Sequence, residues 1–157
     1  TSRAASSTLR SRSNCRLMRV LPWLLDEVGQ RFPDMKVVIC HLGYPYAAEA
    51  MGVVARNPNF HADLSALGFY HPRTVYQLIH DFGCVNPWER LLYGSENPFM
   101  WTFHKTVQGI NEHAKALGMP EIPDHAIELI MGGNATRLYR IDPSVQHRRE
   151  PAAQSAA

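Results

Sequence analysis

The sequence predicts an α/β fold in which helices cover a parallel sheet. Short apolar runs of strand length alternate along the chain with segments whose apolar residues recur at helical spacing. The three runs begin at residues 36, 59 and 90, so 23 and 31 residues separate their starts. Strands separated by helical segments pair in parallel through right-handed crossovers. No glycine-rich nucleotide motif and no hydrolase nucleophile elbow follows any of the runs.

Three segments are predicted as strands, at residues 36–41, 59–65 and 90–93. The first is a continuous apolar run, which is typical of a strand buried on both faces. Alternation along it would place Val37, Ile39 and His41 on one face. The third run ends in Gly94-Ser95-Glu96-Asn97-Pro98, a small residue and a carboxylate followed by a sharp turn.

The helical segments have recognisable ends. Pro22 suits the first turn of a helix over 21–32, and Pro33 ends it. Gly83 and Gly118 are expected to cap the helices over 72–82 and 101–117, and Asn134 is expected to be the N-cap of a last short helix through Tyr139. The remaining helices are expected over 46–56 and 123–131.

Composition excludes several classes of protein. The chain has 157 residues, 45% of them hydrophobic, and a formal net charge of +2, which does not favour nucleic acid as a partner. No apolar run approaches the roughly 20 residues of a membrane span. Cys15, Cys40 and Cys84 form no CxxC pair, which is typical of a reduced protein, and we expect a cytoplasmic location.

The two ends differ in composition from the rest. Residues 1–19 are rich in Ser and Arg and contain no acid, which fits a transit peptide but equally a disordered or foreign tail. Residues 142–157 are expected to be a disordered tail. The folded domain is therefore expected over residues 20–141.

Polar side chains stand where the predicted strands end. His41 follows the first strand, Asp63 and Ser65 the second, and Glu96 the third. The carboxyl ends of parallel strands share one rim, so these groups could converge there. Imidazole and carboxylate are ligands for Zn²⁺ and can act as general bases. The alternatives are a hydrogen-bonded structural histidine and a turn or cap carboxylate. His61, at the start of its strand, is expected on the opposite rim.

Four motifs follow one another in order along the chain, at residues 31–43, 57–65, 90–99 and 131–139, and the last contains Gly132-Gly133-Asn134-Ala135 followed by Arg137-Leu138. Together they resemble the amidohydrolase-related family, the metal-dependent hydrolases and decarboxylases that include aminocarboxymuconate-semialdehyde decarboxylase. The resemblance implies the C-terminal part of a (β/α)₈ TIM-type barrel, with equivalents of strands 6–8 and closing helices. An unrelated α/β domain would leave the order of the motifs unexplained.

The resemblance also implies roles. Glu96 and His41 would be the metal-contacting and catalytic residues, with Glu96 as base and His41 stabilising negative charge. The family has Asp where this chain has Glu96, so the carboxylate would be displaced by about 1 Å, which matters for catalysis. Tyr44, Ser65 and Asn97 are the candidate pocket residues. Zinc is the expected metal.

The resemblance implies a His-x-His or Glu-x-His pair on the first strand of the barrel and a histidine on the fifth, and neither has a counterpart here. A whole barrel takes about 250 residues. Two functions therefore stay open. One is a hydrolase or decarboxylase of small carboxylate-bearing or cyclic substrates. The other is a catalytically incomplete fragment that serves as a remnant or interaction module. Exposed barrel edges would favour self-association.

Overall fold

A computed structural model describes residues 21–95 and 100–142, and its centre is a three-stranded parallel sheet. The strands are β1 (Val37–Ile39), β2 (Phe60–Asp63) and β3 (Leu91–Leu92), in that order. Helices α2 (Ala47–Arg56) and α3 (Pro72–Val85) make the two crossovers. The predicted parallel α/β sheet is confirmed.

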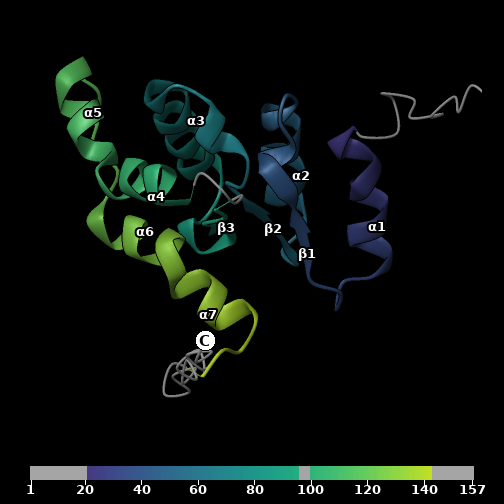
Figure 1. The fold of residues 1–157 in the computed structure, drawn as a ribbon. Helices are drawn as coiled ribbons and strands as arrows, with labels where there is room; N and C mark the ends of the chain where they lie inside the picture. Colours follow the sequence, from purple (N-terminus) through teal and green to yellow (C-terminus); the bar gives the residue numbers. More distant parts are fainter. Residues whose placement is uncertain (1–20, 96–99, 143–157) are drawn as a thin grey trace, which may run out of the picture.

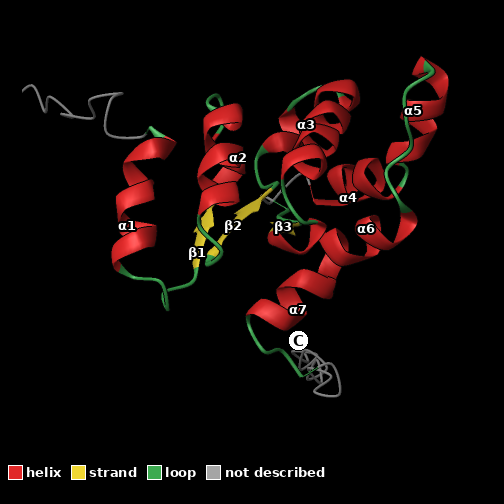
Figure 2. Cartoon of the chain, turned by 180° about the vertical axis from the view of Figure 1, so that it is seen from behind, coloured by secondary structure: helices red, strands yellow, loops and turns green. Residues whose placement is uncertain are grey.

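The other helices lie beside this sheet and come from the parts of the chain before β1 and after β3. A 3₁₀ turn at Pro22–Leu25 runs into α1 (Asp26–Arg31), which lies beside α2 (Figure 1). The helices that follow β3 in the sequence lie on its side of the sheet (Figures 1 and 2). They are α4 (Met100–Gln108), α5 (Ile110–Leu117), α6 (Asp124–Glu128) and α7 (Asn134–Leu138). None of the described helices has the length and apolarity needed to cross a bilayer.

The central strand β2 buries one of its faces fully and the other only partly. Phe60 and Ala62 are fully buried, whereas His61 and Asp63, which alternate with them, are half-buried. The buried face packs on the helices, since a side chain at Gly29 of α1 would collide with Phe60. The expectation that the first strand is buried on both faces is wrong, because Val38 pairs with His61 on the half-buried face.

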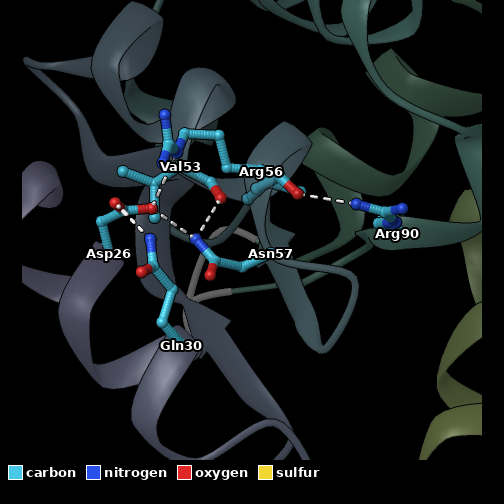
Figure 3. Close-up of polar contacts among 7 residues, drawn as sticks. Asp26, Gln30, Val53, Arg56, Asn57 and Arg90 are labelled. Carbon is cyan, nitrogen blue, oxygen red and sulfur yellow. Dashed lines mark hydrogen bonds and ion pairs between the residues drawn. The ribbon is translucent and has the colours of Figure 1, made fainter.

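A buried amide ties α1 to the end of α2 (Figure 3). Asn57 is 2% exposed, and its Nδ2 donates to Asp26 Oδ1 at 2.8 Å and to the Val53 carbonyl at 2.9 Å. Gln30 and Arg56 contact the same Asp26 carboxylate. The N-terminal helix is thereby fixed against the first crossover.

The C-terminal segment covers the outer edge of β3. The Tyr93 N–H donates to the Ile130 carbonyl at 2.8 Å, and Nδ2 of Asn134 donates to the carbonyls of Trp88 and Leu91 at 2.8 and 2.7 Å. Two exposed sheet edges were expected, and for β3 that expectation is wrong. Among the described residues β1 pairs only with β2. Self-association through a free edge stays a prediction.

Three predicted helix boundaries are wrong for physical reasons. Gly83 lies inside α3, where a Cβ would stand 1.9 Å from the Trp88 ring, so it provides space for packing and is not a cap. Asn134 donates through its side chain to the carbonyls of Trp88 and Leu91, and the chain is already helical before it. Gly109 divides the expected 101–117 helix into α4 and α5, whereas Gly118 does cap α5, with φ of +64°. The predicted tails fall outside the described residues, apart from Asp142.

Candidate functional site

The candidate site lies at the carboxyl ends of the strands, and a tight turn brings His41 there. β1 ends at Ile39, and the chain enters a 3₁₀ turn at Cys40–Gly43. His41 and Leu42 have φ of +58° and +50°, in the left-handed region that costs L-residues about 1–2 kcal/mol each. The prediction that strand alternation places His41 on the face of Ile39 is therefore wrong. The turn, not the pleat, sets its direction.

Asp63, the last residue of β2, holds this turn in place. Its Oδ1 accepts the backbone N–H of His41 at 2.9 Å and that of Ser65 at 3.0 Å. The same oxygen accepts the Ser65 hydroxyl. The carboxylate thus satisfies two main-chain donors that leave the sheet.

Ser65 in turn orients the imidazole of His41. Nδ1 lies 3.0 Å from the Ser65 carbonyl oxygen and 2.8 Å from Ser65 Oγ. The carbonyl can only accept, and the hydroxyl gives its proton to Asp63, so Nδ1 must carry a hydrogen and donate. The neutral ring then has its lone pair on Nε2. Such an oriented imidazole can accept a proton or ligate a metal through Nε2.

A pocket of about 160 Å³ opens beside His41. Its wall is aromatic, and it is lined by His41, Tyr44, Ala66, Leu67, Phe69 and Tyr70. The rings of Tyr44 and Tyr70 stand 4.4 Å apart between centroids. Desolvation, and then the hydrogen bond with Tyr44, raise the pKa of Tyr70 above its usual range. Of the predicted pocket residues, Tyr44 lines this pocket, whereas Ser65 contacts the His41 ring and is not among the lining residues.

The tip of β3 packs closely on the tip of β2. A Cβ on Gly94 would lie 2.8 Å from Cβ of Ser65 and 3.1 Å from its backbone nitrogen, so glycine is needed for the approach. Tyr93, Ser95, Trp101 and His104 line a further pocket of about 300 Å³. Burial raises the pKa of Tyr93.

The predicted metal site can be examined only in part. Glu96 and Asn97 lie outside the described residues. Within the described part of the chain no group of three or more His, Cys, Asp or Glu side chains could hold a metal. His41 offers one donor, and the Asp63 carboxylate is engaged by the backbone. The described residues therefore do not form a complete metal site.

The sequence did not reveal how the polar groups at this end of the sheet contact one another. It placed His41, Asp63 and Ser65 on one rim but did not identify the chain of contacts from Asp63 through Ser65 to His41. The Asp-x-Ser spacing at a strand end was the available indication, since short acidic side chains bond the backbone two residues on. It also overlooked a basic pocket at the opposite rim, next to His61.

The comparisons with known proteins agree with this geometry. The amidohydrolase family matches residues 12–141, most of the chain. This chain belongs to the amidohydrolase family. The family resemblance drawn from the four motifs is confirmed. A search of curated proteins finds no match.

Two solved structures share the fold of this amidohydrolase-family chain. An uncharacterised TIM-barrel protein from Bordetella bronchiseptica is 27% identical, with a TM-score of 0.55, over 80% of this chain and 41% of that one. A zinc-bound amidohydrolase from Burkholderia multivorans is 18% identical, with a TM-score of 0.58, over 79% of this chain and 50% of that one. The chain thus spans at most half the length of these neighbours, and the predicted partial barrel is confirmed.

Proposed function

We propose that this chain supplies the C-terminal part of the active site of a metal-dependent hydrolase or decarboxylase. The observation that carries the proposal is the His41 ring, which Ser65 and Asp63 orient so that Nε2 is its available atom. Active sites of TIM-type barrels lie at this end of the strands. The family assignment supports metal-dependent hydrolysis as the ancestral chemistry.

The proposed task of His41 is to move a proton at Nε2 and to stabilise negative charge. When Nε2 takes a proton the ring becomes cationic, and the hydrogen bonds from Nδ1 to Ser65 and from Ser65 to Asp63 stabilise that charge. The protonated ring can then donate to an oxygen that gains negative charge in the transition state. Glu96 is proposed as the base.

Zinc is the proposed cofactor, because the Burkholderia multivorans neighbour carries bound zinc. We propose His41 and Glu96 as its donors from this chain, with further donors from outside it or from a second copy. Metal binding and proton transfer are alternative roles for His41, because Nε2 cannot ligate a metal and carry a proton at the same time. Loss of metal in a His41 variant would show that Nε2 is a metal ligand and not the proton donor.

The proposed substrate is a small carboxylate-bearing or cyclic molecule. The pocket beside His41 has an aromatic wall of Tyr44, Phe69 and Tyr70, which suits a flat ring. Phe69 is 64% exposed, so the pocket opens to solvent. Hydrolysis and decarboxylation share this arrangement, and substrate screening separates them.

A second candidate is a non-enzymatic remnant or interaction module. Its support is that the described residues, which leave out Glu96, bring together no three His, Cys, Asp or Glu side chains that could hold a metal.

The metal content of the purified chain distinguishes the metal-dependent enzyme from the non-enzymatic remnant. Near-stoichiometric zinc that falls in both His41→Ala and Glu96→Ala, but not in a variant of the exposed His125, supports the enzyme. No metal above background, with all variants alike, removes the proposal that this chain completes a zinc site alone or with a second copy, and it favours the remnant.

A further inference from the structure

A basic pocket lies at the amino ends of the strands, opposite the candidate site. Its volume is about 340 Å³, within the range of small-molecule sites. Residues just before the strands and around α7 line it, chiefly Lys36, His61, Glu89, Arg90, Arg137 and Arg140. Because the strands are parallel, this pocket and His41 stand at opposite ends of the sheet.

The charges in this pocket are unbalanced. Four cationic side chains face one carboxylate, a formal charge of +4 − 1 = +3 with His61 neutral. None of the four forms an ion pair with a carboxylate of the described residues, and that includes Glu89. Like charges gathered around a concave surface raise its potential and concentrate anions there.

Two of the guanidinium groups are already oriented. Nη1 of Arg90 donates to the Val54 carbonyl at 2.6 Å, as Figure 3 shows at the end of α2. Nη2 of Arg137 donates to Oδ1 of Asn134 at 3.1 Å. Each bond uses one nitrogen of a group with five N–H donors. The remaining donors are held in place at little further entropic cost, which favours planar, bidentate binding of an oxyanion.

His61 adds a polar atom that lacks a partner. Its Nδ1 is buried without a hydrogen bond among the described residues. Burial lowers the pKa of His61 below 6.5 and the cations of Lys36 and Arg90 lower it further, while backbone contacts with Asn59 and Val37 offset part of this shift. An anion in the pocket would reverse this effect.

We propose that this pocket binds the phosphoryl group of a small molecule. Three arginines and a lysine match a dianion with several acceptor oxygens better than a single carboxylate, which carries one charge. Glu89 disfavours bulky polyanions at its side of the pocket, so the expected ligand presents one phosphoryl group. The proposal is independent of the chemistry at His41.

Titration of the whole chain at constant ionic strength tests this, with inorganic phosphate as the probe and acetate as the comparison. We expect saturable 1:1 phosphate binding by calorimetry, with the His61 pKa rising when phosphate is bound. Arg140→Gln and Lys36→Gln should each weaken binding about fivefold to tenfold. Arg73→Gln removes an equal charge from exposed α3, outside the pocket, and should not weaken it.

Three results would overturn the proposal. They are absence of saturable phosphate binding, acetate binding as tightly as phosphate, and equal loss in Arg73→Gln and Arg140→Gln. Lys36 and Arg140 are exposed and make no ion pair among the described residues, so their variants are expected to fold. Circular dichroism of each variant checks this.

Discussion

Asp63→Ala tests whether one carboxylate holds the candidate site together. Its Oδ1 accepts three hydrogen bonds, from the His41 N–H, the Ser65 N–H and the Ser65 hydroxyl. Removing it leaves two part-buried main-chain donors without a partner. The left-handed turn at His41 loses the bond that anchors it to β2.

The magnitude follows from counting these bonds. Each is worth about 1 kcal/mol in a part-buried setting, so the free energy of unfolding should fall by about 3 kcal/mol. For a chain of this length about 1 kcal/mol shifts Tm by roughly 2–4 °C. Asp63→Ala should therefore lower Tm by about 6–12 °C. Asp63→Asn keeps one oxygen that can accept and should lose about half as much.

Urea unfolding followed by far-UV circular dichroism measures this change, provided that the m-value stays constant. Asp34→Ala is the matched control, since Asp34 is exposed and its carboxylate has no partner among the described residues. It should stay within about 0.5 kcal/mol of the parent chain. If Asp63→Ala behaves like Asp34→Ala, the carboxylate does not anchor the turn and the reasoning fails.

Three further predictions concern the sheet ends. Asn134→Ala should cost about 2–4 kcal/mol in urea unfolding, because the buried Leu91 carbonyl and the part-buried Trp88 carbonyl lose their donor; a cost under 1 kcal/mol would show that water replaces the amide. Gly94→Ala should cost about 1–3 kcal/mol and shift the NMR signals of Ser65, which its Cβ would approach to 2.8 Å; unchanged signals would contradict the close approach. The His61 pKa is lowered on folding, so unfolding takes up a proton and stability falls as pH drops through 6.5 and below. His61→Gln should flatten that slope relative to the parent, and equal slopes would refute the burial effect.

The strand positions could be predicted because apolar runs and breakers lie close to the observed boundaries. Pro33 and Gly118 ended helices near where they were expected, and the parallel order followed from the alternation of elements. Glycines that serve packing could not be recognised, since Gly83 and a capping glycine look alike in sequence. The two roles are distinguished only by the folded structure, in which the Trp88 ring packs against Gly83.

The candidate site was also predictable only in part. Strand-end positions of His41, Asp63 and Ser65 were visible in the sequence, because parallel strands bring their carboxyl ends together. The left-handed turn at His41 could not be predicted from the sequence, because residues other than glycine rarely adopt a positive φ. A hydrogen bond that the His41 N–H donates to Asp63, 22 positions later, stabilises that conformation, and local sequence propensity does not reveal it.

The protonation of the His41 ring is the measurement that tests the central claim most directly. Long-range ¹H–¹⁵N correlation spectra above pH 8 distinguish the two neutral tautomers. The account predicts hydrogen on Nδ1 and a lone pair on Nε2, with this preference weakened in Ser65→Ala. Hydrogen on Nε2 in the parent chain would contradict it, because the ring would then not be presented for proton transfer or metal binding through Nε2.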